Sequence, residues 1–134
     1  AYLYNADITP RIISSQVRHI DFMPTILDML NIPINTSFER LDGKSLMPII
    51  NGQNVSEEFA FSETGNPLNE NAPPKAPNTK SIRSSKWKLI HNEHDNTMEL
   101  YDLKNDPNEE NNLIGKNSEI EKEFSKELSK YTDN

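Results

Sequence analysis

A strand that stops in a polar turn and then resumes limits the folds open to this chain more than any other feature of its sequence. The segment reads Leu100-Tyr101-Asp102-Leu103, then Asp106-Pro107-Asn108-Glu109, then Asn112-Leu113. Its first four residues suit a half-buried strand, and Pro107 ends that strand because proline fixes φ and cannot donate a ladder hydrogen bond. Asp106 and Asn108 favour a turn through side-chain to backbone hydrogen bonds. The pattern is structural, and none of these residues needs to contact a substrate.

Several segments have the pattern of strands, so a sheet of three or four antiparallel strands is expected. The predicted strands are residues 58–62, 80–84, 86–91 and 98–103. Phe59 and Phe61 alternate with polar residues in the first of them. The middle two can pair as a hairpin about Ser84-Ser85, although that turn lacks the usual glycine. A small sheet of this kind needs a cover on one face.

The cover predicted for this sheet is an amphipathic helix over residues 118–131. Ser118 and Glu121 have the spacing of a capping box. The apolar stripe of this helix is formed by Ile120, Phe124, Leu128 and Tyr131. Glutamate and lysine residues at i,i+3 spacing make the remaining surface a solvated face.

A second helix is predicted over residues 21–31. Asp21 is expected to cap its N-terminus, and Pro24 is tolerated because it falls in the first turn. Its apolar stripe is formed by Phe22, Met23, Ile26, Leu27 and Leu30. Asn31 and Pro33 are expected to end the helix.

The remaining segments are expected to connect these elements. Residues 34–56 form a connector with a turn at Asp42-Gly43. Residues 65–79 contain four prolines and four asparagines, a composition typical of a surface loop. The predicted fold class is therefore α+β, with a small antiparallel sheet covered by a C-terminal helix and preceded by a separate helix.

Four blocks of residues follow one another in a fixed order over residues 17–113. The first block holds Val17, Ile20-Asp21, Pro24-Thr25 and Ile26-Leu27-Asp28, and the second holds Asp42-Gly43-Lys44-Ser45-Leu46 with Pro48 and Gly52. The third holds Ile82-Arg83 and Lys86-Trp87-Lys88-Leu89-Ile90, and the fourth is the segment of residues 100–113. Together they resemble the C-terminal portion of an arylsulfatase-like sulfatase, in the alkaline phosphatase superfamily. The resemblance implies that residues 1–56 are the tail end of a catalytic domain with its connector, and that residues 57–134 are a C-terminal subdomain. It also implies that the helix of residues 21–31 belongs to that larger domain, so we expect its apolar face to have too little cover within this chain.

The catalytic motif of that family does not occur in this sequence. Sulfatases use a formylglycine made from Cys or Ser in a C/S-x-P/A-x-R motif, and this chain has no Cys and no serine in such a motif. The resemblance implies that the calcium-binding residues and the active-site lysine also precede the matched region. We therefore expect no catalytic residue, metal ligand or cofactor within residues 1–134, and we expect calcium and formylglycine in the parent enzyme.

Composition and charge exclude some partners. The formal net charge of −7 and the absence of a basic cluster argue against binding to nucleic acid. No run approaches the ~20 apolar residues of a membrane span. The apolar content of 34% indicates a small core. The composition does not identify the cellular compartment. The family resemblance suggests a periplasmic or secreted protein.

Isolated polar residues have structural explanations that weigh against catalysis. His19, His91 and His94 are not spaced like metal ligands. Asp21 and Asp28 share one side of a helix, and capping and surface solvation account for both. Cationic side chains that could meet an anionic group are those of Arg18, Arg83 and Lys88, although helix and strand edges commonly carry such charges.

One segment has a candidate role in substrate choice. In sulfatases, loops of the C-terminal subdomain lie beside the mouth of the active site, and the matching stretch here is residues 62–67 with the loop that follows. The resemblance implies substrate contacts from Glu63, Thr64 and Asn66. The alternative is an ordinary surface loop. Asn35-Thr36-Ser37 and Asn54-Val55-Ser56 match the glycosylation sequon, which is frequent by chance in an Asn-rich chain.

The sequence therefore predicts the C-terminal fragment of a sulfatase-like hydrolase of sulfate esters, inactive alone, with a structural and substrate-shaping role. Its expected partner is the upstream catalytic domain of the same chain. One alternative is a fragment of a related phosphonate or phosphodiester hydrolase. Another is a stand-alone binding or assembly module that dimerises through the exposed apolar face of residues 22–30.

Overall fold

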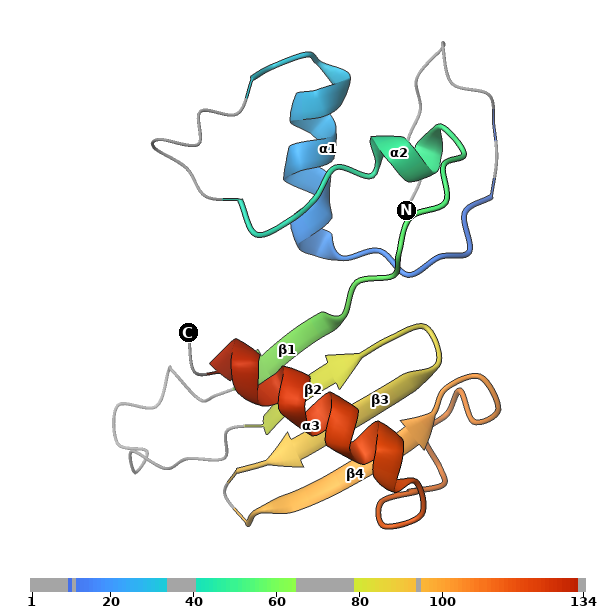
Figure 1. Cartoon of the computed structure of the whole chain (residues 1–134), viewed down its shortest axis with the longest axis vertical. Helices are drawn as coiled ribbons and strands as arrows, with labels where there is room; N and C mark the ends of the chain where they lie inside the picture. The colour runs from blue at the N-terminus through green and yellow to red at the C-terminus, as the bar shows by residue number, and fades with distance from the viewer. Residues whose placement is uncertain (1–9, 11, 34–40, 65–78, 94, 133–134) are drawn as a thin grey trace. The chain divides into compact units, whose positions relative to one another are not determined.

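The structure, a computed structural model, describes residues 10, 12–33, 41–64, 79–93 and 95–132. Its chain divides into two compact units, residues 1–58 (unit 1) and residues 59–134 (unit 2). The boundary predicted from the sequence follows residue 56. Unit 1 holds the first two α-helices, and unit 2 holds the sheet and the last helix (Figure 1).

Unit 1 contains three short helical segments in its described residues. A 3-10 turn, η1 (His19–Asp21), leads directly into α1 (Phe22–Met29), and α2 (Met47–Ile50) is a single turn. Asn31 adopts a left-handed φ of 53° just after α1, as expected of a residue that ends a helix. The predicted helix is thus present, although α1 ends at Met29, two residues before the predicted end.

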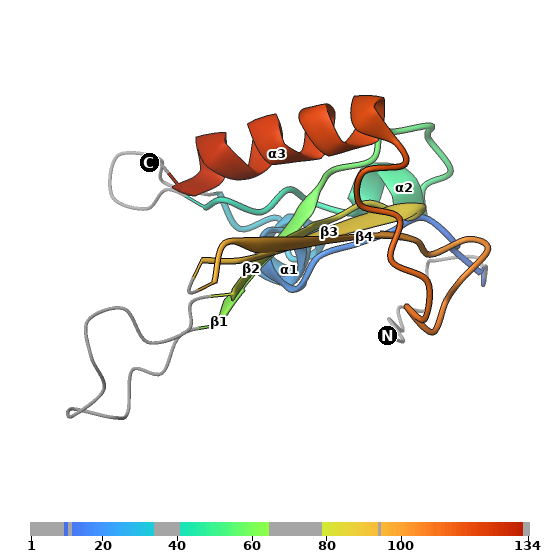
Figure 2. The ribbon, with the colours of Figure 1, turned by 90° about the horizontal axis from the view of Figure 1, so that it is seen from below.

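Unit 2 contains a four-stranded antiparallel sheet in the order β1-β2-β3-β4. The strands are β1 (Ala60–Thr64), β2 (Thr79–Arg83), β3 (Trp87–Asn92) and β4 (Thr97–Asp102). The last helix, α3 (Ser118–Thr132), lies across one face of this sheet (Figure 2). The α+β fold class predicted from the sequence is confirmed, with β1 displaced two residues toward the C-terminus.

The core of unit 2 is one row of side chains under α3. Ile82 pairs with Leu89, and Leu89 pairs with Leu100, so three buried residues lie side by side across the sheet. Phe124 and Leu128 of α3 cover them. Two aromatic contacts join β1 and the residue before it to the same helix. Phe59, just before β1, meets Phe124 edge-on with ring centroids 5.2 Å apart, and Phe61 in β1 stacks on Tyr131 at 4.4 Å.

The turn between β2 and β3 shows how the hairpin forms without glycine. The Ser84 hydroxyl oxygen accepts hydrogen bonds from the backbone N–H groups of Lys86 (3.2 Å) and Trp87 (3.0 Å). The Ser84 N–H donates to the Trp87 carbonyl at 2.9 Å. A serine side chain therefore satisfies the turn amides at this position.

The predicted capping box of the last helix is wrong. The helix begins at Ser118, so Asn117 is the residue that precedes it. The Glu121 carboxylate accepts hydrogen bonds from the N–H groups of Gly115 (2.7 Å) and Asn117 (3.2 Å). The carboxylate thus binds amides one and three residues before Ser118, because the preceding turn presents these two amides to it.

Candidate functional site

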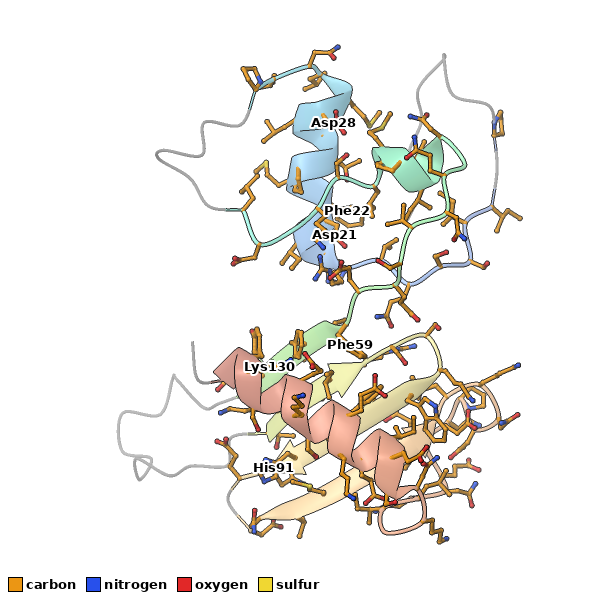
Figure 3. All side chains as sticks on the ribbon, viewed as in Figure 1. Asp21, Phe22, Asp28, Phe59, His91 and Lys130 are labelled. Atoms are coloured by element: carbon orange, nitrogen blue, oxygen red, sulfur yellow. The ribbon has the colours of Figure 1, made fainter. Side chains whose placement is uncertain are left out.

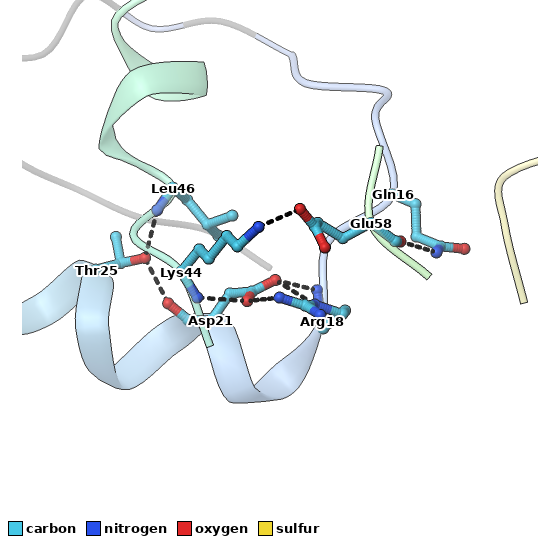
Figure 4. Close-up of polar contacts among 7 residues, drawn as sticks. All are labelled: Gln16, Arg18, Asp21, Thr25, Lys44, Leu46 and Glu58. Carbon is cyan, nitrogen blue, oxygen red and sulfur yellow. Dashed lines mark hydrogen bonds and ion pairs between the residues drawn. The ribbon is translucent and has the colours of Figure 1, made fainter. Parts of the chain in front are cut away.

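The most organised polar cluster in unit 1 lies between α1 and the turn of residues 42–46. We call it the Asp21 network; it consists of Arg18, Asp21, Thr25, Lys44 and Leu46 (Figure 4). It joins the first two sequence blocks described above. Asp21 and Thr25 are one helical turn apart, so both side chains face the same partner segment.

Asp21 is the centre of this network. Its side chain lies 6% exposed and forms an ion pair with Arg18, whose Nη2 is 2.8 Å from Oδ1. The Arg18 N–H and Nε donate to Oδ2 at 3.0 and 3.2 Å. The backbone N–H of Lys44 donates to Oδ1 at 3.0 Å. One carboxylate thus fixes the residues before α1 and the distant turn at the same time.

Burial and hydrogen bonding act on the Asp21 carboxylate in opposite directions. Burial favours the neutral acid, whereas the hydrogen bonds from Arg18 and from the Lys44 N–H favour the carboxylate. The hydrogen bonds prevail, so the pKa of Asp21 lies below its ordinary value. The same hydrogen-bonded pair raises the pKa of Arg18. Both groups are therefore charged at neutral pH.

Thr25, Gly43 and Ser45 complete the contact between α1 and the turn. The Thr25 hydroxyl donates to the Asp21 carbonyl and accepts a hydrogen bond from the Leu46 N–H at 2.8 Å. A Cβ on Gly43 would lie only 1.9 Å from the carbonyl oxygen of Ile20, so no larger residue fits there. The Ser45 hydroxyl donates to the Asp28 carboxylate.

The predicted roles of Asp21 and Asp28 need correction. Asp21 stands at the N-cap position of α1, but its side chain makes no capping hydrogen bond. Its carboxylate points instead toward Arg18 and the 42–46 turn, where it finds better donors. Asp28 is not merely solvated, because it accepts the hydrogen bond from Ser45. Figure 3 shows Asp28 on α1 and Asp21 at the start of that helix.

Glu58, the last residue of unit 1, is held by two other segments of the same unit. Its backbone carbonyl accepts a hydrogen bond from Gln16 Nε2 at 3.0 Å, and its carboxylate pairs with the Lys44 ammonium (Figure 4). Nothing in the sequence patterns singled out Gln16 or Glu58. With Arg18 and Asp21, this cluster holds two cations and two carboxylates, so it offers no surplus positive charge to a sulfate.

Three of the other cationic and imidazole candidates make contacts with neighbouring side chains. Lys88 Nζ contacts both carboxylate oxygens of Glu109, at 2.9 and 2.7 Å. His91 Nε2 lies 3.2 Å from Asn96 Oδ1, and the His19 ring lies 6.0 Å from that of Phe22. Arg83 is exposed at the end of β2, and His94 lies outside the described residues. Within the described part of the chain, no three acidic, histidine or cysteine residues could hold a metal ion.

The C-terminal signature closes one edge of the sheet. Asn112 Oδ1 accepts hydrogen bonds from the N–H groups of Leu100 and Ile114, both at 3.0 Å. The Leu113 N–H donates to the Leu100 carbonyl at 2.8 Å. Both backbone groups of Leu100 on the outer side of β4 are therefore occupied, as a protected edge requires.

The rest of that signature builds the turn that brings Asn112 back to β4. Asp102 accepts a hydrogen bond from Asn105 Nδ2 at 2.8 Å, and Asp106 accepts from the N–H groups of residues 110 and 111. Pro107 is exposed in this turn, and Leu103 is buried. The hydrogen bond with Glu99, together with burial, raises the pKa of Tyr101 to about 12. Each contact is local and structural.

The candidate substrate residues lie at the exposed end of β1. Glu63 and Thr64 are both exposed, and Glu63 pairs with Lys80 and Thr64 with Thr79 across the sheet. Asn66 lies outside the described residues. The substrate role of these three residues stays a prediction. No helix among the described residues has the length and apolar character that crossing a membrane requires.

Comparison with known proteins gives consistent matches over most of the chain. The family model described as N-sulphoglucosamine sulphohydrolase, C-terminal, matches residues 3–134. A choline-sulfatase of Rhizobium meliloti is 30% identical over 110 residues, which are 79% of this chain and 19% of the relative. The chain spans about a fifth of the length of the curated relatives that it matches, 19% and 22%.

Solved structures share the fold. The structure of BT4656 in complex with its substrate D-glucosamine-2-N,6-O-disulfate has a TM-score of 0.66 and 29% identity, and the match covers 85% of this chain and 24% of that one. A phosphonate monoester hydrolase from Silicibacter pomeroyi has a TM-score of 0.53 at 24% identity, covering 84% and 23% of the two chains. At that identity the second likeness concerns the fold alone.

Proposed function

Because this chain belongs to the sulfatase family, in the group described as N-sulphoglucosamine sulphohydrolase, C-terminal, we propose that it serves as the C-terminal part of an enzyme that hydrolyses sulfate esters. In this role the chain stabilises the enzyme and shapes its substrate site, and it is inactive alone. The family match over residues 3–134 is the observation that carries the proposal. The sulfatases among the relatives support sulfate esters as the class of substrate. They do not identify the individual substrate.

The exposed apolar face of α1 supports a role as one part of a larger protein. Met23 and Ile26 of α1 and Leu30, the residue that follows it, lie along one side of the helix and are 58%, 47% and 62% exposed. The opposite side is occupied by the Asp21 network. Exposed apolar residues that form a continuous stripe mark a surface that packs against another protein segment. We assign this face to the catalytic part of the sulfatase.

The catalytic groups of such an enzyme lie outside this chain in our proposal. Among the described residues, no three acidic, histidine or cysteine side chains are grouped so that they could hold a metal ion. Three of the carboxylates are paired with cations instead: Asp21 with Arg18, Glu58 with Lys44, and Glu109 with Lys88. The sequence also lacks the motif from which formylglycine is made. Calcium and formylglycine therefore belong to the parent enzyme, and no chemical step is assigned to residues of this chain.

A chimeric enzyme tests the proposal. This chain replaces the matched segment of BT4656, and hydrolysis is measured on D-glucosamine-2-N,6-O-disulfate and on a small aryl sulfate. We expect the chimera to release sulfate in the presence of calcium, whereas BT4656 without the segment, and this chain alone, do not. Sulfate release by this chain alone would contradict the proposal.

Matched variants test the role of the helix face within the same chimera. Ile26→Glu should lower the yield of soluble, active chimera because a charge would be buried against the catalytic part. Val55→Glu is the control, since Val55 is also apolar and 45% exposed but lies outside α1. Equal yields of the two variants would show that this face of α1 does not contact the catalytic part. A stable dimer of the isolated chain that Ile26→Glu dissociates would favour a stand-alone assembly module instead.

The substrate-shaping role has its own test in the chimera. Glu63→Gln and Thr64→Ala should raise KM for the disulfated sugar and leave KM for the small aryl sulfate unchanged, because only the larger substrate would reach β1. Thr97→Ala is the control, since Thr97 is also an exposed strand residue but lies on β4, outside residues 62–67. Unchanged KM values in both variants would leave this segment with a structural role only.

A further inference from the structure

The chain leaves α2 through Asn51-Gly52, the only Asn-Gly pair in the sequence. Both residues are exposed to solvent. In such a pair, the backbone nitrogen of the glycine can attack the side-chain carbonyl carbon of the asparagine. Glycine offers the least resistance to this attack, because it has no Cβ and its backbone turns freely. The pair is therefore chemically labile unless the fold restrains it.

The fold restrains this pair through a hydrogen-bonded turn. Three consecutive backbone N–H groups donate to carbonyls of α2: Asn51 to Met47 (2.8 Å), Gly52 to Ile49 (2.9 Å) and Gln53 to Pro48 (2.9 Å). The last two bonds, with Gly52 at a left-handed φ of 84°, form a Schellman motif at the end of the helix. The same bonds hold Asn51 at a ψ of 4°. The nitrogen that would attack is therefore engaged, and the backbone cannot rotate to bring it to the side chain.

This protection lasts only as long as α2 is formed. The helix has four residues, too few to be stable without tertiary contacts. Its first turn is anchored by the Leu46 N–H, which donates to the Thr25 hydroxyl at 2.8 Å (Figure 4), and Ile50 is buried at its end. Thr25 is itself 1% exposed. Loss of the Thr25 contact should therefore open α2 and release the Gly52 amide.

We propose that Asn51 is a deamidation site that α2 protects, so that it reacts only when this turn opens. The Gly52 nitrogen bonds to Cγ of Asn51, which closes a succinimide ring. The side-chain NH2 group leaves with the Gly52 N–H proton, transferred through solvent, as ammonia. Water then opens the ring at either carbonyl and gives aspartate or isoaspartate. The proposal is independent of the assignment to a sulfatase.

Either product weakens the turn from which it came. Isoaspartate adds a methylene group to the main chain, which moves the N–H groups of Gly52 and Gln53 away from their acceptors. Aspartate places a negative charge beside the last carbonyls of α2, which already carry partial negative charge. Opening of α2 is reversible, whereas deamidation is not. Each reaction therefore leaves a lasting record that unit 1 has opened at this point.

Parallel measurements of deamidation and hydrogen exchange test the proposal in the full chain. Tandem mass spectrometry follows the conversion of Asn51, and exchange of the Gly52 amide hydrogen reports the opening of the turn. The native chain should deamidate at least about tenfold more slowly than the chain unfolded in urea at the same pH and temperature. Amide exchange should be slowed by a similar factor, since one opening governs both. No product at Asn51 in the unfolded chain, or equal rates in the two states, overturns the proposal.

A variant of Thr25 tests the role of α2 without altering the reactive pair. Thr25→Val removes the acceptor of the Leu46 N–H, so Asn51 should deamidate about fivefold faster or more in the native buffer. If this variant unfolds unit 1, the rate should equal that of the chain in urea. Thr97→Val is the control, because Thr97 is an exposed residue on β4 of unit 2 and its loss should leave the rate unchanged. A deamidation rate that does not follow the exchange of the Gly52 amide overturns the proposal.

Discussion

Asp21 is a charged side chain in a buried position, which makes it the residue on which unit 1 depends most. Only 4% of the residue is exposed, and its carboxylate holds both Arg18 and the amide of Lys44. Arg18 is also largely buried, with 13% of its side chain exposed. Removing one charge of such a pair leaves the other without compensation.

Asp21→Asn should therefore destabilise unit 1 by about 3 kcal/mol or more. Asp28→Asn is the matched control on the same helix; it should cost below about 1 kcal/mol because its partner, Ser45, is a neutral hydroxyl. Hydrogen exchange of the α1 amides measures both. Similar losses in the two variants would show that the charge of Asp21 is not what matters.

The same carboxylate predicts how unit 1 responds to acid. Its pKa is lower in the folded chain than its ordinary value of 3.8. The group therefore contributes stability above that ordinary value and loses the contribution as the pH falls through the lowered pKa. The stability difference between wild type and Asp21→Asn should be largest near neutral pH and should shrink below about pH 4. A difference that stays constant in acid would contradict this assignment.

Gly43 is required for space and not for backbone freedom. Gly43→Ala places a methyl group against the Ile20 carbonyl, and the backbone must move, at a cost of about 1–3 kcal/mol to unit 1. Gly115→Ala is the contrasting control in unit 2. Nothing lies within 4 Å of its added Cβ, and its φ of +79° is the source of strain. Hydrogen exchange should report loss of protection in α1 for Gly43→Ala alone.

At the scale of elements, the edge of β4 shows what the C-terminal signature does. An open edge strand offers unpaired amides and carbonyls to other chains. Here Asn112 and Leu113 bind the N–H and carbonyl of Leu100, in the middle of the strand. The signature thus acts through the backbone of β4, while the Leu100 side chain fills the core.

Asn112→Ala should destabilise unit 2 by about 1–3 kcal/mol, because the Leu100 amide loses its acceptor. Chemical unfolding followed by the fluorescence of Trp87, the single tryptophan, measures this loss. Asn111→Ala is the neighbouring control: its backbone amide binds Asp106, and this contact survives the substitution. Equal stability of both variants would mean that water replaces Asn112 without cost.

The sheet and helices were predictable because their patterns are local. Period-two alternation predicts the strands, and the stripe of Phe124 and Leu128 predicts the helix that covers them. The predicted position of β1 was wrong by two residues. The roles of Asp21, Thr25 and Asp28 were harder to see. Their spacing marks one face of a helix, but the sequence does not say which distant segment supplies the donors. The contacts of Gln16 and Glu58 were not predictable, because Gln16 binds a backbone carbonyl, a group that every residue carries.

At the scale of the whole molecule, the two units have separate sources of stability. Unit 1 relies on a polar network that joins α1 to the 42–46 turn, whereas unit 2 relies on an apolar row under α3. Trp87 lies in unit 2, so its fluorescence reports on that unit. Hydrogen exchange of α1 reports on the other.

Phe124→Ala should remove about 3–5 kcal/mol from unit 2, because the side chain is 2% exposed and covers the buried row of the sheet. The unfolding transition followed by Trp87 fluorescence should therefore have its midpoint at a much lower denaturant concentration. The α1 amides should keep their protection, because unit 1 is stabilised by its own polar network. Loss of protection in α1 to the same extent would show that the two units unfold together.

The closure of β4 by Asn112 and Leu113 also has a bearing on synthesis. The chain emerges from the ribosome from its N-terminus, so β4 is complete before α3 exists. Residues 112 and 113 follow the end of β4 at Asp102 closely, and a loop of about ten residues closes in well under a microsecond. Asn112 and Leu113 can therefore bind the outer edge of β4 before α3 is synthesised. Variants that open this edge should aggregate chiefly during translation, even where the finished protein is stable.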